Sequence, residues 1–114
     1  MQAMLDFLDK DIPFDIVFAA NDPSALGVLA ALQKRNISHG FAIYGVDGSP
    51  MGKEMIKQGH IEGTSAQFPH EMGIRSASVA YDILEGKRIS KYIFMPIKLI
   101  TSENIDQYSL SGWQ

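Results

Sequence analysis

The chain has 114 residues, of which 46% are hydrophobic and 20% charged, a composition typical of a folded globular domain rather than a disordered segment. Its net charge of −3 argues against the basic surface that binding to a nucleic-acid backbone requires, so no nucleic-acid partner is expected. Cysteine is absent, which excludes disulfide bonds, thiolate nucleophiles and cysteine-based zinc sites.

The first eight residues read as part of a helix. Met4, Leu5 and Leu8 fall at helical spacing, and the segment lacks the basic start and long apolar centre of a signal peptide. A chain that opens inside a helix is expected to be numbered from within a longer protein.

The next segment predicts a strand followed by a helix. Residues 15–20 form a short apolar, β-branched run, which is typical of a strand buried on both faces of a parallel sheet. The run ends in Asn21 and Asp22. Pro23 then opens a helix over residues 24–35, and we expect Asp22 to cap its free amides.

The same unit recurs at residues 41–46. This second strand ends in Asp47, Ser49 is placed to cap the next helix over residues 51–58, and Gly59 is placed to end it. Strands that alternate with helices at this spacing predict right-handed crossovers.

A third strand over residues 61–66 ends in Gln67, and Pro69 precedes a helix over residues 70–84. The predicted fold is therefore α/β, with a parallel sheet between two helical layers in an αβα arrangement.

Three polar side chains, Asn21, Asp47 and Gln67, follow the ends of the three predicted strands. In an open α/β sheet, ligands bind beyond the carboxyl ends of the strands, so these side chains are expected to converge. Two amides that donate and accept, with one carboxylate that only accepts, suit a neutral polyol and would repel a phosphate. The sequence thus predicts a site for a hydroxyl-rich ligand, with no metal and no cofactor.

The strand-end residues have a structural alternative, and the motifs of other site classes fit poorly. Asn and Asp are common caps and turn formers, whereas Gln67 is not a favoured cap. Residues 48–53 resemble a phosphate-binding loop but have the wrong glycine spacing. Ser65 lacks the following glycine of a nucleophile elbow, so a hydrolytic serine is the least favoured reading. The histidines lack the spacing of metal ligands.

Four motifs carry a family resemblance: AANDPSALG at 19–27, IYGVDGSP at 43–50, IKQGHIEGTSAQ at 56–67, and Met72-Gly73. In this order they resemble the C-terminal half of type I periplasmic sugar-binding proteins of the ribose and galactose kind. The resemblance covers residues 15–106. It implies one flavodoxin-like half of a two-lobed fold, and therefore an incomplete domain.

The resemblance implies a function as well. In that family the residues matching Asn21, Asp47 and Gln67 bind sugar hydroxyls. The chain would then be part of a periplasmic or otherwise extracytoplasmic carrier of a monosaccharide, not an enzyme, that delivers sugar to the permease of an ABC transporter. The alternative is the effector-binding lobe of a lactose-repressor-type regulator or of a sugar-sensing receptor. His39-Gly40 and the residues at 62–65 depart from the repressor pattern and favour transport.

The resemblance also divides the chain. Residues 1–67 and about 90–100 would belong to the C-terminal lobe, with a returning strand near 92–99. Residues 68–89 would form a hinge and a helix that packs on a second, missing lobe. Because that helix carries an apolar side, we expect the isolated fragment either to fold the helix back onto its own sheet or to self-associate.

Overall fold

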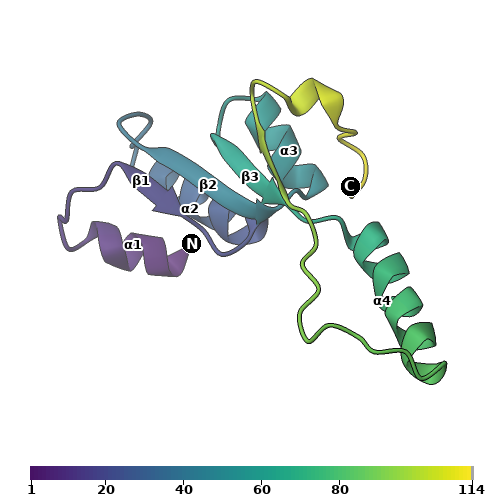
Figure 1. Ribbon diagram of the computed structural model, residues 1–114. Helices are drawn as coiled ribbons and strands as arrows, with labels where there is room; N and C mark the ends of the chain where they lie inside the picture. Colours follow the sequence, from purple (N-terminus) through teal and green to yellow (C-terminus); the bar gives the residue numbers. More distant parts are fainter. Residues whose placement is uncertain (114) are drawn as a thin grey trace.

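A computed structural model describes residues 1–113 (Figure 1). In chain order, the elements are α1 (Gln2–Leu8), β1 (Ile16–Phe18), α2 (Asp22–Lys34), β2 (Ala42–Asp47), α3 (Pro50–Lys57), β3 (Gly63–Ala66), α4 (Pro69–Leu84), β4 (Lys98–Thr101) and the short 3₁₀ helix η1 (Ile105–Gln107). The predicted alternation of strands and helices is confirmed, although β1 and β3 are shorter than the apolar runs that predict them.

The four strands form one sheet in the order β1-β2-β3-β4. The first three strands are parallel, as predicted, and α2 and α3 are the crossovers between them. β4 returns antiparallel to β3, with Thr64 opposite Ile100. An antiparallel return follows from the path of the chain, which leaves the sheet beyond the carboxyl end of β3 and re-enters it from the same end through a long excursion (Figure 1).

α1, α2 and α3 lie on one face of the sheet. Ile43 of β2 and Ile100 of β4 point into this core and are almost completely buried. On the other face, Phe18 is 71% exposed and Leu99 55% exposed. The α/β class is confirmed, but within residues 1–113 the second helical layer expected from the sequence does not cover that face. The reason is geometric, because successive right-handed crossovers between neighbouring strands place α2 and α3 on the same side.

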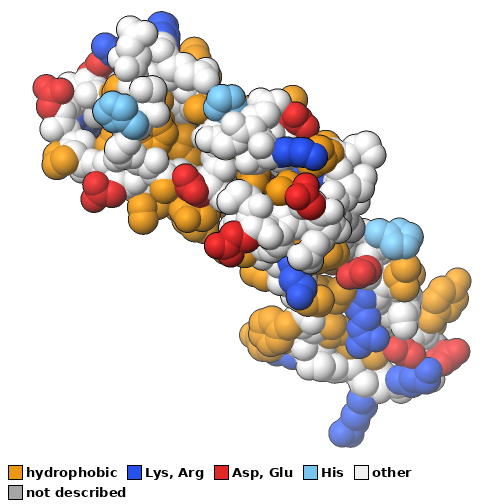
Figure 2. Space-filling model, turned by 90° about the horizontal axis from the view of Figure 1, so that it is seen from above, with side chains coloured by type: hydrophobic (Ala, Val, Ile, Leu, Met, Phe, Trp, Pro, Cys, Tyr) orange, Lys and Arg blue, Asp and Glu red, His pale blue; other side chains and the backbone are white. Residues whose placement is uncertain are grey.

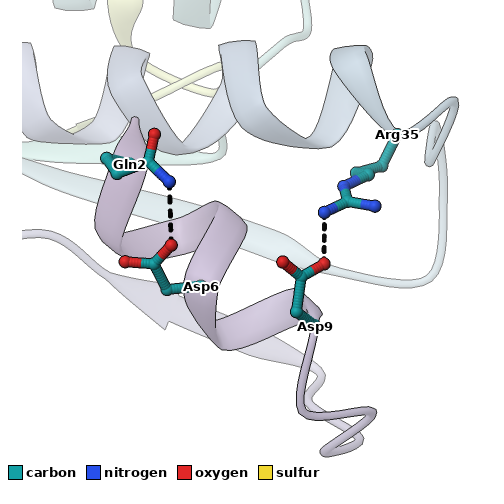
Figure 3. A network of polar contacts seen from close by, with 4 residues as sticks. All are labelled: Gln2, Asp6, Asp9 and Arg35. Atoms are coloured by element: carbon teal, nitrogen blue, oxygen red, sulfur yellow. Dashed lines mark hydrogen bonds and ion pairs between the residues drawn. The ribbon is translucent and has the colours of Figure 1, made fainter.

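α1 packs beside α2 at the edge of the sheet formed by β1. Met4 and Leu5 of α1 are buried in the common core. The carboxylate of Asp9, which follows α1, pairs with the guanidinium of Arg35 at the end of α2, and Gln2 donates to Asp6 within α1 (Figure 3). The predicted N-terminal helix is therefore an integral part of this half of the molecule.

α4 projects away from the sheet, and none of its residues is buried (Figure 1). The molecule measures 58 × 31 × 18 Å, and its radius of gyration of 17.9 Å exceeds the value of about 13 Å expected for a compact chain of this length. Residues 86–97 run back along α4, and Met72, Val79, Ile93 and Met95 line a shallow hollow between them. The predicted strand near 92–99 forms only from Lys98, because the residues before it lie beside α4 and not beside β3.

Candidate functional site

The three predicted site residues lie at the edge of the sheet where the carboxyl ends of the parallel strands meet, which is called the edge from here on. β1 and β2 pair with Phe18 opposite Tyr44, so Asn21 and Asp47 each follow that pair by three residues. Asp47 is opposite Ala66 of β3, and Gln67 is the next residue. The structure therefore places all three beyond or at the carboxyl ends of neighbouring parallel strands.

Asp47 and Gln67 are in direct contact. The Gln67 side-chain amide Nε2 donates to Asp47 Oδ1 at 3.1 Å, and the Gln67 backbone N–H donates to the Asp47 carbonyl at 3.1 Å. Asp47 is half-buried, whereas Gln67 is exposed. The pair presents a carboxylate with remaining acceptor capacity next to an amide carbonyl, both accessible from solvent.

The backbone turns sharply at Asp47. Its φ is 123° and that of Gly48 is 69°, and both values lie in the region that favours glycine. A non-glycine residue held there costs of order 1–3 kcal/mol and persists only where the surroundings fix it. The turn therefore sets the direction of the Asp47 side chain.

Asn21 has a second task, because it caps α2. Its Oδ1 accepts from the Ser24 backbone N–H at 2.9 Å. The sequence-based assignment of this cap to Asp22 is wrong. The helix begins at Asp22, one residue earlier than predicted, so the residue before it, Asn21, is in the cap position. The cap uses Oδ1 and leaves the Nδ2 group of Asn21 as a donor at the edge.

Asp22 is instead completely buried beneath the edge. Its Oδ2 accepts from the Ser49 backbone N–H at 2.7 Å, and its Oδ1 accepts from Thr64 Oγ1 at 2.6 Å. Thr64 Oγ1 in turn accepts from the Gly48 backbone N–H at 3.1 Å. Asp22 thus joins the ends of β1, β2 and β3. Sequence reasoning missed this network, because its partners lie far away in the chain.

Lys53 of α3 is buried as well, and its Nζ donates to the backbone carbonyls of Ser109 and Gly112. Burial lowers the pKa of the Lys53 ammonium from its usual 10.5, and the negative charge of Asp22 partly offsets this by raising it. Lys53 therefore anchors the C-terminal tail to α3, on the side of the sheet where Asp22 lies.

A separate hollow of about 670 Å³ lies at the opposite end of the sheet, lined by residues that include Leu29, Gln33, Phe41, His60 and Glu62. None of the three predicted site residues borders it. Within residues 1–113 no group of three or more His, Cys, Asp or Glu side chains is placed to hold a metal ion. In the same part of the chain, no helix combines the length and the apolar character that crossing a bilayer demands.

The sequence matches a family model described as a periplasmic binding protein domain over residues 1–88, the stretch that holds all three strand ends. The chain belongs to this family of periplasmic binding proteins. The resemblance stated from the motifs is confirmed.

Individual relatives of the periplasmic binding protein family agree with this assignment. The ribose import binding protein of Bacillus subtilis is 37% identical over 103 residues, which are 90% of this chain and 33% of that protein. Its counterpart in Salmonella typhimurium is 31% identical over the same share of this chain and 34% of its own length. The chain thus spans about a third of the length of the curated relatives it matches.

Solved structures show the same fold. An ABC transporter solute binding protein from Bacillus halodurans, with bound myo-inositol, is 29% identical and has a TM-score of 0.82 over 94% of this chain and 37% of that chain. A periplasmic solute binding protein from Actinobacillus succinogenes, with bound D-allose, has a TM-score of 0.84 over 94% of this chain and 38% of that chain. At 22% identity, the second likeness concerns the fold alone.

Proposed function

We propose that this chain is the sugar-contacting part of a substrate-binding protein that delivers a monosaccharide to an ABC transporter. The observation that carries the proposal is the contact between Asp47 and Gln67 at the carboxyl edge of the sheet, with Asn21 on the neighbouring strand end. Relatives named for ribose import and D-allose binding support the ligand class.

The chemistry of the edge suits vicinal hydroxyl groups. Each sugar hydroxyl donates one hydrogen and accepts another, so Asp47 can accept from two neighbouring hydroxyls while Asn21 Nδ2 and the Gln67 amide supply donors. Two neutral hydrogen bonds and one charge-assisted bond amount to about 5 kcal/mol before the losses of association. Because those losses lower the affinity further, the edge alone should bind in the millimolar range at best.

Tighter binding requires a second surface over the sugar. We propose that residues 1–67 and 98–113 belong to one lobe, and that α4, with the returning residues beside it, packs on another lobe across a hinge at Phe68 and Pro69. The exposed apolar side chains of α4, such as Ile83 and Leu84, support this division. The whole protein would work outside the cytoplasmic membrane, with a permease as partner, and would carry its ligand without chemical change.

Calorimetric titration of this chain with ribose, allose and myo-inositol tests the proposal. We expect millimolar binding of at least one of them and a loss of at least tenfold in Asp47→Ala, because the charge-assisted contact goes. Glu62→Ala, which removes an exposed carboxylate at the opposite end of the sheet, is the matched control and should bind as the unchanged chain does. Equal affinity of the Asp47→Ala variant and the unchanged chain would remove Asp47 from the site.

The alternative, a sugar-responsive lobe of a regulator or receptor, predicts the same ligand contacts. It differs in the partner, since only a transport protein should stimulate ATP hydrolysis by a reconstituted permease when sugar is bound. That measurement separates the two functions.

A further inference from the structure

We propose that Asp22 is the positioning residue of the sugar-contacting edge: its buried carboxylate holds the turn that presents Asp47 to the ligand. This inference rests on the proposed function of Asp47, but its structural part can be tested without any sugar. It assigns a role to a residue whose sequence context predicts only a helix cap.

The first support is that both backbone amides following Asp47 end in the same network. The Ser49 N–H donates to Asp22 Oδ2 at 2.7 Å, and the Gly48 N–H donates to Thr64 Oγ1 at 3.1 Å. Thr64 passes this interaction on, because its hydroxyl donates to Asp22 Oδ1 at 2.6 Å. The turn after Asp47 is therefore tied, directly and through Thr64, to one carboxylate.

The second support is the direction of these hydrogen bonds. An ionised carboxylate only accepts, so the Thr64 hydroxyl must give its proton to Asp22 and is left as an acceptor for Gly48. An amide in place of the carboxylate would offer one acceptor and one donor. With the amide nitrogen toward Ser49, two donors would face each other. With it toward Thr64, the hydroxyl oxygen could accept from both the amide and Gly48, but the hydroxyl proton would lose its carboxylate acceptor. Both orientations therefore replace charge-assisted hydrogen bonds by weaker neutral ones.

The third support is the space made for the carboxylate. A Cβ atom on Gly45 would collide with Asp22 Oδ1, and a Cβ atom on Gly52 would collide with Asp22 Oδ2. Asp22 and Thr64 are both fully buried. Gly45 on β2 and Gly52 on α3 thus leave a space that fits this carboxylate. A residue that only caps a helix would not need such a space.

The fourth support is the strain at the point being held. Asp47 has a φ of 123°, a backbone conformation that a non-glycine residue rarely adopts unless surrounding contacts hold it there. The hydrogen bonds to Gly48 and Ser49 supply that support on one side, and the Gln67 N–H to the Asp47 carbonyl supplies it on the other. Loss of Asp22 should let the Asp47 backbone relax and should swing its carboxylate away from the edge.

The test combines two substitutions with two readouts. We expect Asp22→Asn to weaken sugar binding at least tenfold in the otherwise unchanged chain, but less than twofold in a chain that already carries Asp47→Ala. Such non-additivity is the mark of one residue acting through another. Equal losses in both backgrounds, or unchanged binding with lowered thermal stability, would show that Asp22 has a structural role only and would overturn the proposal.

The second readout is amide hydrogen exchange without ligand, measured by NMR. Asp22→Asn should speed exchange at Gly48 and Ser49 by at least tenfold relative to the amide of Ile43 in β2, the strand that precedes them. Should Asp22→Asn fail to fold, Thr64→Val removes the link to Gly48 at nearly constant volume, and Thr64→Ser should restore it. Unchanged exchange at Gly48 in Thr64→Val would contradict the proposal even if no sugar binds, whereas faster exchange in a chain that binds no sugar would contradict only the proposed function.

Discussion

Two parts of the molecule have similar apolar patterns and very different surroundings. The sheet body, residues 1–67 and 98–113, holds every buried hydrophobic residue found within residues 1–113. The α4 arm, residues 68–97, buries none, and Figure 2 shows exposed apolar side chains at the end of the molecule that α4 occupies. A repeating apolar pattern therefore predicts that a helix forms, but it does not say what the helix packs on.

The difference between the two parts follows from their partners within the chain. Ile43 of β2 and Ile56 of α3 are both buried in the one hydrophobic core of the sheet body. Met72 and Val79 of α4 instead line a shallow hollow together with Ile93 and Met95 of the returning segment, and no residue of α4 is buried. Self-association through this arm stays a prediction, which the mass of the chain in solution can test.

The largest expected difference in stability is between two leucine-to-alanine variants, one in each part of the molecule. Leu32 of α2 is fully buried, whereas Leu84 at the end of α4 is 82% exposed. Leu32→Ala should lower the free energy of unfolding by about 2–5 kcal/mol, because a cavity is left behind. Leu84→Ala should change it by no more than about 0.5 kcal/mol. Urea unfolding measures both, and similar losses would mean that α4 packs on the sheet body in solution.

A smaller effect is expected at the tail of the sheet body. Lys53→Met removes the ammonium that binds the carbonyls of Ser109 and Gly112, and should cost about 1–3 kcal/mol. Limited proteolysis should then release the last residues faster. Lys34→Met, which changes an exposed lysine at the end of α2, is the control, and equal cleavage of the two variants would show that Lys53 does not hold the tail.

Lys53 also makes the free energy of unfolding of the sheet body depend on pH. Its pKa is lowered in the folded chain, so between that lowered value and 10.5 the unfolded chain binds more protons than the folded chain does. The Lys53 contribution therefore makes the free energy of unfolding rise with pH across this alkaline window. Lys53→Met should lack this contribution, and an identical alkaline profile of the variant and the unchanged chain would argue against the buried ammonium.

The smallest stability effect separates the two tasks of Asn21. Asn21→Ala should cost about 1 kcal/mol, because the Ser24 amide loses its cap. Asn21→Ser keeps an oxygen that can cap and should keep most of the stability, but it lacks the Nδ2 donor. If sugar affinity falls in both variants while stability falls only in the first, Asn21 is a cap and a ligand residue together. Full affinity in Asn21→Ser would restrict it to the cap.

The sequence predicts the positions of the strand-end residues well, because the apolar runs and the polar, Gly and Pro residues that follow them are local signals. Asp47 and Gln67 each directly follow an apolar run, and their contact needs only that parallel strands end together. Asp22 could not be assigned in this way. Its partners Ser49 and Thr64 lie 27 and 42 residues away, and nothing local distinguishes a buried carboxylate from a cap. The antiparallel direction of β4 could not be predicted from local signals either, because it depends on where the α4 arm turns back.

The central claim is that Asn21, Asp47 and Gln67 contact one sugar together. NMR titration of the ¹⁵N-labelled chain with ribose, allose and myo-inositol tests it most directly. The claim predicts saturable shifts, with one common dissociation constant, at the backbone and side-chain amides of Asn21 and Gln67 and at the backbone amides of Asp47 and Gly48. Shifts confined to the hollow near Phe41 and His60, or different dissociation constants at the three strand ends, would contradict it.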